Sequence, residues 1–146
     1  MQVGAVLKHK GYAVISVTAA TMVTEIAEII SARRIGAVVV LDADGKLVGI
    51  VSERDVVKAL AAHRAGILDM TADQLMTRDV KTATLGTTME QAMGMMDAGY
   101  FRHLPVVENA KLVGIISIRD VVQARMMVQE QEVDSLKSYV ARAGSY

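Results

Sequence analysis

The chain has 146 residues and no cysteine, and its Lys and Arg balance its Asp and Glu at 16 each. A net charge of zero and an aromatic content of 3% argue against nucleic-acid binding, while the lack of cysteine excludes disulfides and thiolate metal sites. No run of about 18 apolar residues and no secretory pattern occurs, so we expect a cytoplasmic protein without a membrane span.

The first half of the chain has the pattern strand, helix, strand, strand, helix. A β-branched run predicts a buried strand, and the Asp-Gly pair at 44–45 predicts a hairpin turn after it. Apolar residues at helical spacing flank this hairpin on both sides. The predicted elements are a strand at 14–17, a helix from Thr21 or Met22, strands at 37–41 and 47–51, and a helix from Ser52 to about Ala62.

The second half repeats this order and adds a further helical segment. Its elements are a strand at 80–83, a helix at 89–98, strands at 104–107 and 112–116, and a helix from Ile118. Met89, Met93 and Met96 recur at helical spacing and are expected in the core. Residues 126–140 read as a charged helix with a narrow apolar stripe of Val133, Leu136 and Val140, suited to docking on the body or on a second subunit.

The two halves are copies of one unit. Residues 46–59 and 111–124 are identical at eleven of fourteen aligned positions, which chance does not produce in a short chain. A half of this size buries too little surface to be stable alone, so we expect the halves to pack their sheets together. The predicted fold is α/β (α+β), two βαββα repeats with pseudo-twofold symmetry plus a C-terminal helix. The predicted bounds are 10–62 and 76–125 for the repeats, 63–75 for the linker and 126–146 for the helix and tail.

A Gly-x-x-Ser-x-x-Asp motif occurs once in each unit, ending at Asp55 and at Asp120. One interpretation is a helix capping box, with Ser at the N-cap and an acid in the first turn. The other is a ligand site, because a helix N-terminus attracts phosphate and a carboxylate one turn in can accept hydrogen bonds from ribose hydroxyls. The duplication, with Arg54 and Arg119 before the acids, favours the second.

The motif Val-Gly-Ile-x-Ser-x-Arg-Asp-Val-Val after a hairpin, together with residues 101–107 (Phe-Arg-His-Leu-Pro-Val-Val), resembles a tandem pair of CBS (cystathionine-β-synthase-type) domains. The resemblance covers roughly residues 10–125. It implies a regulatory module that needs no cofactor, binds AMP, ADP, ATP or NADH between its repeats, acts on a protein target that the sequence does not name, and forms at least a homodimer.

The resemblance also assigns residues to two clefts. In the first, Asp120 would hold the ribose. The phosphates would be surrounded by Ser117, Arg119, Arg102 and His103, and the adenine by Ile115, Val14, Ile15, Ile35, Gly36 and Ala37. In the second, Asp55 would hold the ribose, with Ser52, Arg54, Lys81 and Phe101 around it. Because the first cleft has more cationic side chains, we rank it first.

Three other functions stay open. The chain could be a structural dimerisation module with vestigial clefts, or a nucleotide-processing enzyme, although each cleft offers one acid and no acid/base pair. Nucleic-acid binding is the least favoured, given the neutral charge and few aromatics.

Overall fold

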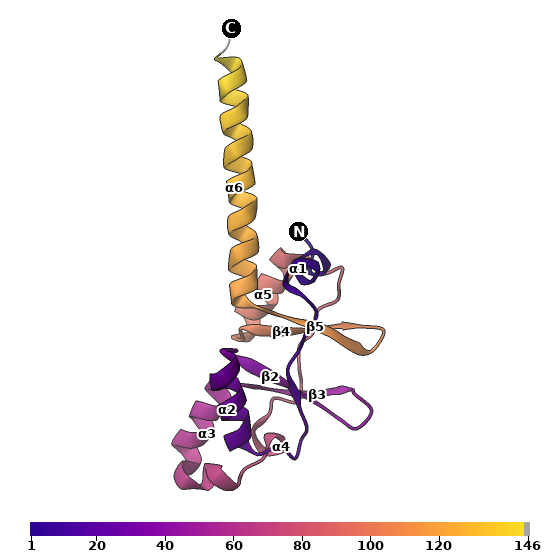
Figure 1. The fold of residues 1–146 in the computed structure, drawn as a ribbon, viewed down its shortest axis with the longest axis vertical. Coiled ribbons are helices and arrows are strands. Elements are labelled where there is room, and N and C mark those ends of the chain that lie inside the picture. Colours follow the sequence, from indigo (N-terminus) through magenta and orange to yellow (C-terminus); the bar gives the residue numbers. More distant parts are fainter. Residues whose placement is uncertain (145–146) are drawn as a thin grey trace.

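The computed structural model describes residues 1–144 and has two lobes joined end to end (Figure 1). The first lobe contains β1 (Ser16–Val17), α2 (Val23–Arg33), β2 (Ala37–Leu41), β3 (Leu47–Ser52), α3 (Glu53–His63), a 3₁₀ turn (Arg64–Asp69) and α4 (Ala72–Leu75). The second contains α1 (Val3–Lys10), α5 (Met89–Gly99), β4 (His103–Glu108), β5 (Lys111–Ser117) and the first turns of α6 (Ile118–Ala143). The mixed α and β fold with a C-terminal helix is confirmed.

The two hairpins have the same strand register. The antiparallel pair β2–β3 begins with Ala37 opposite Ser52, and β4–β5 begins with His103 opposite Ser117. Each hairpin has a register shift at the same point, between Val40 and Leu41 in one and between Val106 and Val107 in the other. The internal repeat seen in the sequence therefore extends to the backbone irregularities.

The strand predicted to open each unit is shorter than expected. Residues 14–17 form a strand only over Ser16–Val17, which runs parallel to β2. Residues 80–83 form no named strand: only Ala83 bridges to Val106, and it exchanges backbone hydrogen bonds with Pro105 and Val107 at 2.9 and 2.8 Å. The chain turns directly after Ala83, where Thr87 N donates to Thr84 O at 3.2 Å, so this segment pairs with β4 at one residue only.

Helix α1 packs on the second repeat, although it precedes the first in the chain (Figure 1). Val3 and Gly4 donate backbone hydrogen bonds to Thr87 and Leu85 at 2.8 and 2.9 Å. Leu7 is fully buried and lies 2.7 Å from where a Cβ of Gly114 would be, so only glycine fits beneath it.

Helix α4 packs on the first repeat in the way that α1 packs on the second. Ala72 and Asp73 donate to the backbone oxygens of Thr21 and Ala19 at 2.8 and 3.0 Å, and Met76 covers Gly49 as Leu7 covers Gly114. Each repeat is thus closed by a short helix that the chain supplies just before the other repeat. The sequence analysis missed both helices.

Each repeat has its own apolar core. The second is built around Leu104 and Ile116, with Met89 and Met96 buried and Met93 packed against it, as predicted for these methionines. The first is built around Val38, Val40 and Val51 and includes Ile26 from α2. The continuous β-branched runs are buried because helices cover them on one side and the other lobe lies on the other (Figure 1).

Helix α6 extends far beyond the second lobe (Figure 1). Its buried residues are Val121 and Ala124, and every residue from 125 to 144 is exposed. The predicted stripe of Val133, Leu136 and Val140 therefore does not dock on the body. Within residues 1–144, no helix has both the length and the apolarity needed to cross a bilayer.

We predict that Leu7→Ala destabilises the protein by about 2–5 kcal/mol, because it opens a cavity over Gly114 in the second core. Urea unfolding measures this change. Leu68→Ala is the matched control, since the Leu68 side chain is 58% exposed and its loss should change stability by no more than about 0.5 kcal/mol. Equal effects of the two substitutions would contradict the docking of α1.

Candidate functional site

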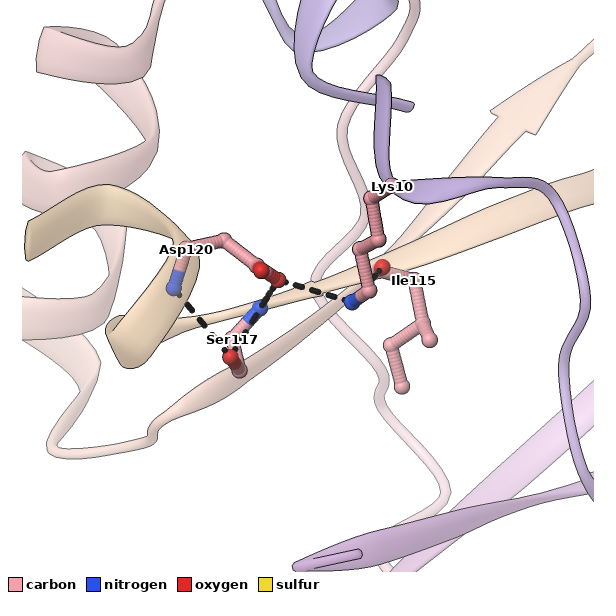
Figure 2. A network of polar contacts seen from close by, with 4 residues as sticks. All are labelled: Lys10, Ile115, Ser117 and Asp120. Atoms are coloured by element: carbon pink, nitrogen blue, oxygen red, sulfur yellow. Dashed lines mark hydrogen bonds and ion pairs between the residues drawn. The ribbon is translucent and has the colours of Figure 1, made fainter. Parts of the chain in front are cut away.

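The two Ser-x-x-Asp motifs form equivalent capping boxes at the N-termini of α3 and α6. In the second (Figure 2), Ser117 donates from its backbone N and its Oγ to Oδ2 of Asp120 at 2.8 and 3.2 Å, and Asp120 N donates back to Ser117 Oγ at 3.4 Å. In the first, Ser52 and Asp55 make the same three hydrogen bonds at 2.8, 3.0 and 3.2 Å. The capping interpretation is confirmed in both copies.

Capping leaves each carboxylate able to bind something else. Both hydrogen bonds that each carboxylate accepts from its serine end on Oδ2, and within residues 1–144 Oδ1 of neither Asp55 nor Asp120 accepts one. The Asp120 side chain is only 13% exposed, at the positive end of the α6 dipole. The capping role therefore holds the carboxylate in place and does not exclude a ligand role.

Lys10 contacts Asp120 directly and was missed by the sequence analysis. Its Nζ lies 2.7 Å from Asp120 Oδ2 and donates to the Ile115 carbonyl oxygen at 2.8 Å (Figure 2). Lys10 ends α1, so the packing of α1 on the second repeat delivers it to this cleft. No local motif could reveal a contact between residues so far apart in sequence.

The other cleft has no such cation. Helix α4 ends at Leu75, whereas α1 continues to Lys10, so α4 delivers no side chain to the Asp55 cleft as α1 delivers Lys10 to that of Asp120; Asp79 lies beyond its end. Asp79 pairs with the exposed Lys81 at 3.4 Å, and Asp55 forms no ion pair within residues 1–144. The two clefts therefore share a cap and differ in charge.

His103 links the two repeats beside Asp120. It pairs with Ser117 across the hairpin, and its Nε2 lies 2.6 Å from where a Cβ of Gly36 would be. The absence of a side chain at Gly36 makes room for the imidazole. The structure thus brings five predicted site residues together around one point, and Lys10 joins them: Gly36, His103, Ile115, Ser117 and Asp120.

The electrostatic surroundings of His103 are mixed. Burial is the main influence and lowers the pKa of the His103 imidazole, and the positive charges of Lys10 and Arg102 lower this pKa further. The negative charges of Glu53 and Asp120 act in the opposite direction and raise the pKa. The net result is a histidine that resists protonation. It can therefore donate or accept one hydrogen bond without carrying charge into the cleft.

The remaining predicted residues lie around these clefts. Arg102, Arg119 and Arg54 are exposed, and none forms an ion pair with the described part of the chain. Val14, Ile15 and Ile35 are half-buried, and Ala37 is buried in β2. Phe101 packs on the core of the second repeat against Gly99.

A hollow of about 540 Å³ opens between α2 and α3, with Ile35, Gly36 and Glu53 in its wall. Two of its lining residues, Ile35 and Gly36, are among those predicted to surround the adenine. Residues 1–144 contain no group of three His, Asp or Glu side chains arranged to hold a metal ion.

We predict that the free energy of unfolding falls as the pH drops below about 6.5, the ordinary pKa of histidine, and that His103 contributes to this fall. The unfolded chain takes up a proton there that the folded protein resists, so the His103 contribution is constant above that pH. Urea titrations at several pH values should show that the free energy of unfolding of His103→Gln falls less steeply with decreasing pH than that of the wild-type protein. His63→Gln, at an exposed position, should leave the slope unchanged, and an unchanged slope in His103→Gln as well would contradict the prediction.

Comparison with known proteins follows the same division of the chain. The family model for the CBS domain matches twice, at residues 9–62 and 72–127. A 17.7 kDa protein of Acidianus ambivalens is 39% identical over 111 residues, which are 75% of this chain and 66% of that protein. A CBS domain-containing protein of Arabidopsis thaliana is 27% identical over 127 residues, 87% of this chain but 23% of its own length. The chain thus spans about two thirds of the first relative and about a quarter of the second.

Solved structures share the whole two-lobed arrangement. A CBS-domain-containing protein of Agrobacterium tumefaciens is 45% identical with a TM-score of 0.84, covering 86% of this chain and 99% of that one. A CBS domain protein of Pyrobaculum aerophilum complexed with AMP is 26% identical with a TM-score of 0.77, covering 91% and 99%. A CBS domain pair in complex with 5′-methylthioadenosine and S-adenosyl-L-methionine is 27% identical with a TM-score of 0.76, covering 85% and 98%. The chain with its two capped hairpins is therefore a member of the CBS domain family, as a tandem pair.

Proposed function

We propose that this chain is a regulatory module that binds an adenine nucleotide, AMP, ADP, ATP or NADH, in the cleft of Asp120. The observation that carries the proposal is the half-buried arrangement of one capped carboxylate, one lysine and one neutral histidine at a helix N-terminus between two repeats. The AMP complex and the methylthioadenosine and S-adenosylmethionine complex of similar CBS proteins support an adenosyl ligand.

Each part of such a ligand has a matching group. Asp120 Oδ1 is available for the ribose hydroxyls while Oδ2 stays in the cap. The N-terminus of α6 and the exposed, unpaired Arg102 and Arg119 suit the phosphates. The half-buried Ile115 and Ile35, with Val14 and Ile15, suit the flat apolar faces of adenine.

The Asp55 cleft is proposed as the weaker site. Ser52, Arg54 and Lys81 are its polar groups, and the Lys81 ammonium is already paired with Asp79. Gly36 and Ala37 stand in the first repeat where Arg102 and His103 stand in the second. The second site therefore has fewer charged groups for phosphate.

Lys10 makes the charge of a phosphate matter for binding in the Asp120 cleft. Its ammonium pairs with Asp120 through Oδ2. A ribose at Oδ1 shares the same carboxylate charge, and this weakens the ion pair at a carboxylate that is only 13% exposed. A phosphate nearby offers Lys10 a new partner, whereas an uncharged nucleoside does not. We propose that Lys10 makes the cleft select nucleotides over nucleosides.

We propose a binding role for this chain and no catalytic step. We propose that it works in the cytoplasm as a homodimer and passes its ligand state to a protein target. The competing account is a dimerisation module with vestigial clefts. Titration of the wild-type protein with AMP, ATP and NADH decides between them, since no heat at millimolar ligand would favour the competing account.

We predict that Asp120→Asn weakens nucleotide binding by roughly tenfold to a hundredfold, the loss of a charged hydrogen-bond acceptor. Asparagine keeps an oxygen for the capping box, so the fold should persist. Isothermal titration of the best wild-type ligand should show a smaller loss for Asp55→Asn and none for Asp79→Asn, whose side chain is 91% exposed. Equal losses at Asp120 and Asp55 would refute the ranking of the clefts.

We predict that Lys10→Met lowers the ratio of AMP affinity to adenosine affinity by about tenfold or more, since it leaves the whole Asp120 carboxylate to the ribose and removes a phosphate partner. Competition titrations with both ligands give the ratio. Lys8→Met, at an exposed position on the same helix, should leave it unchanged. A Lys10→Met protein with the wild-type ratio would show that the ion pair has no role in selection.

A further inference from the structure

The outer part of α6 lacks the packing that normally sustains a helix. Residues 125–144 are all exposed. Arg125, Val128, Gln129 and Glu132 still line a hollow with Met1 and the start of α5, and beyond them the helix extends away from both lobes (Figure 1). Most of the stability of helices in proteins comes from tertiary packing of an apolar face, which this stretch lacks. It also exposes large apolar side chains to solvent: Met126 is 55% exposed, Leu136 63% and Val140 60%. A partner that covers these side chains would account for both features.

The exposed apolar residues of α6 follow a coiled-coil heptad. Positions alternating by four and three residues from 122 to 143 are apolar with one exception, Gln129. We call this set the α6 seam; it consists of Val122, Met126, Gln129, Val133, Leu136, Val140 and Ala143. Val133 and Val140 at a and Leu136 at d match the β-branched a and leucine d composition that favours two parallel strands, whereas Met126 at a and Val122, Gln129 and Ala143 at d depart from it.

The charges beside the seam fit the same arrangement. In a parallel pair each g residue faces the e residue five positions later in the partner helix. Arg125 then faces Glu130 and Glu132 faces Lys137, and the twofold symmetry doubles both attractive pairs. An antiparallel pair with the same overlap sets Arg125 and Glu132 against Tyr139 or another Glu132, so it forms fewer attractive pairs.

The seam also lies on a side of α6 that a second molecule can reach. The body covers Val121 and Ala124, whereas the seam residue Val122 between them is 50% exposed. At 3.6 residues per turn the seam lies roughly a third of a turn from the buried face. The helix can therefore pack on its own lobe and on a partner helix at once.

We propose that the α6 seams of two copies of this chain form a parallel two-stranded coiled coil. The inference rests on the homodimer in the proposed function and adds the surface, the orientation and the register. It does not depend on nucleotide binding, so a protein that fails to bind nucleotide can still pair in this way.

Disulfide trapping tests the register directly, because the natural chain has no cysteine. Gln129→Cys, at a d position, keeps every apolar seam residue and brings the two sulfurs into bonding range in a parallel pair. Gln131→Cys, two residues away on the outer face, is the matched control. Mild oxidation of the full chain should cross-link the first variant and leave the second uncross-linked.

Sedimentation equilibrium separates the other outcomes. A dimeric mass without cross-linking at residue 129 would mean that the chain pairs through another surface or antiparallel, and would overturn the coiled coil but not the homodimer. A monomeric mass would overturn both. Equal cross-linking at residues 129 and 131 would indicate random collision and would equally count against the proposed register.

Charge reversal tests the orientation without cysteine. Glu132→Lys and Lys137→Glu each place like charges across the parallel pair, and each should raise the dimer dissociation constant by roughly tenfold. Mixing the two variants restores opposite charges at both places, so the mixture should form a heterodimer of near wild-type affinity. A mixture as weak as its components would rule out the g-to-e pairing.

Discussion

The packing of α1 on the second repeat is the contact on which the site depends. Leu7 fills the space that Gly114 leaves in β5, and the backbone of Val3 and Gly4 pairs with the segment before α5. This contact closes the second core, and it also fixes the end of α1 beside the start of α6. Lys10 meets Asp120 because a hydrophobic residue one turn earlier is buried.

Duplication supplies the scaffold, and small departures from it supply the chemistry. Both repeats share the hairpin register, the bulge and the capping box, so both place a carboxylate at a helix N-terminus. The clefts differ where the repeats differ: Lys10 pairs with Asp120 while Asp55 has no such partner within residues 1–144, and His103 stands where the first repeat has Ala37. Gly36 matters for the same reason, because a side chain there would occupy the space of the His103 ring.

The parts of the fold that were predictable are those with local signals. The hairpins, the capped helices and the core methionines have short-range patterns, and the repeat supports each pattern with a second copy. The roles of α1 and α4 were not predictable in this way, since they depend on which repeat each helix covers. The Lys10–Asp120 pair lies beyond any motif for the same reason. The strand predicted at 80–83 was too long, because only Ala83 pairs with β4.

The crossing of the two short helices has a topological consequence. Helix α1 leads into the first repeat but completes the second, and α4 leads into the second but completes the first. This is the connectivity of a domain-swapped dimer whose two protomers have been joined into one chain. A cut in the linker before α4 would leave two fragments, each of which carries the helix that completes the other. Neither fragment therefore has a complete core of its own, and the two lobes have to fold together.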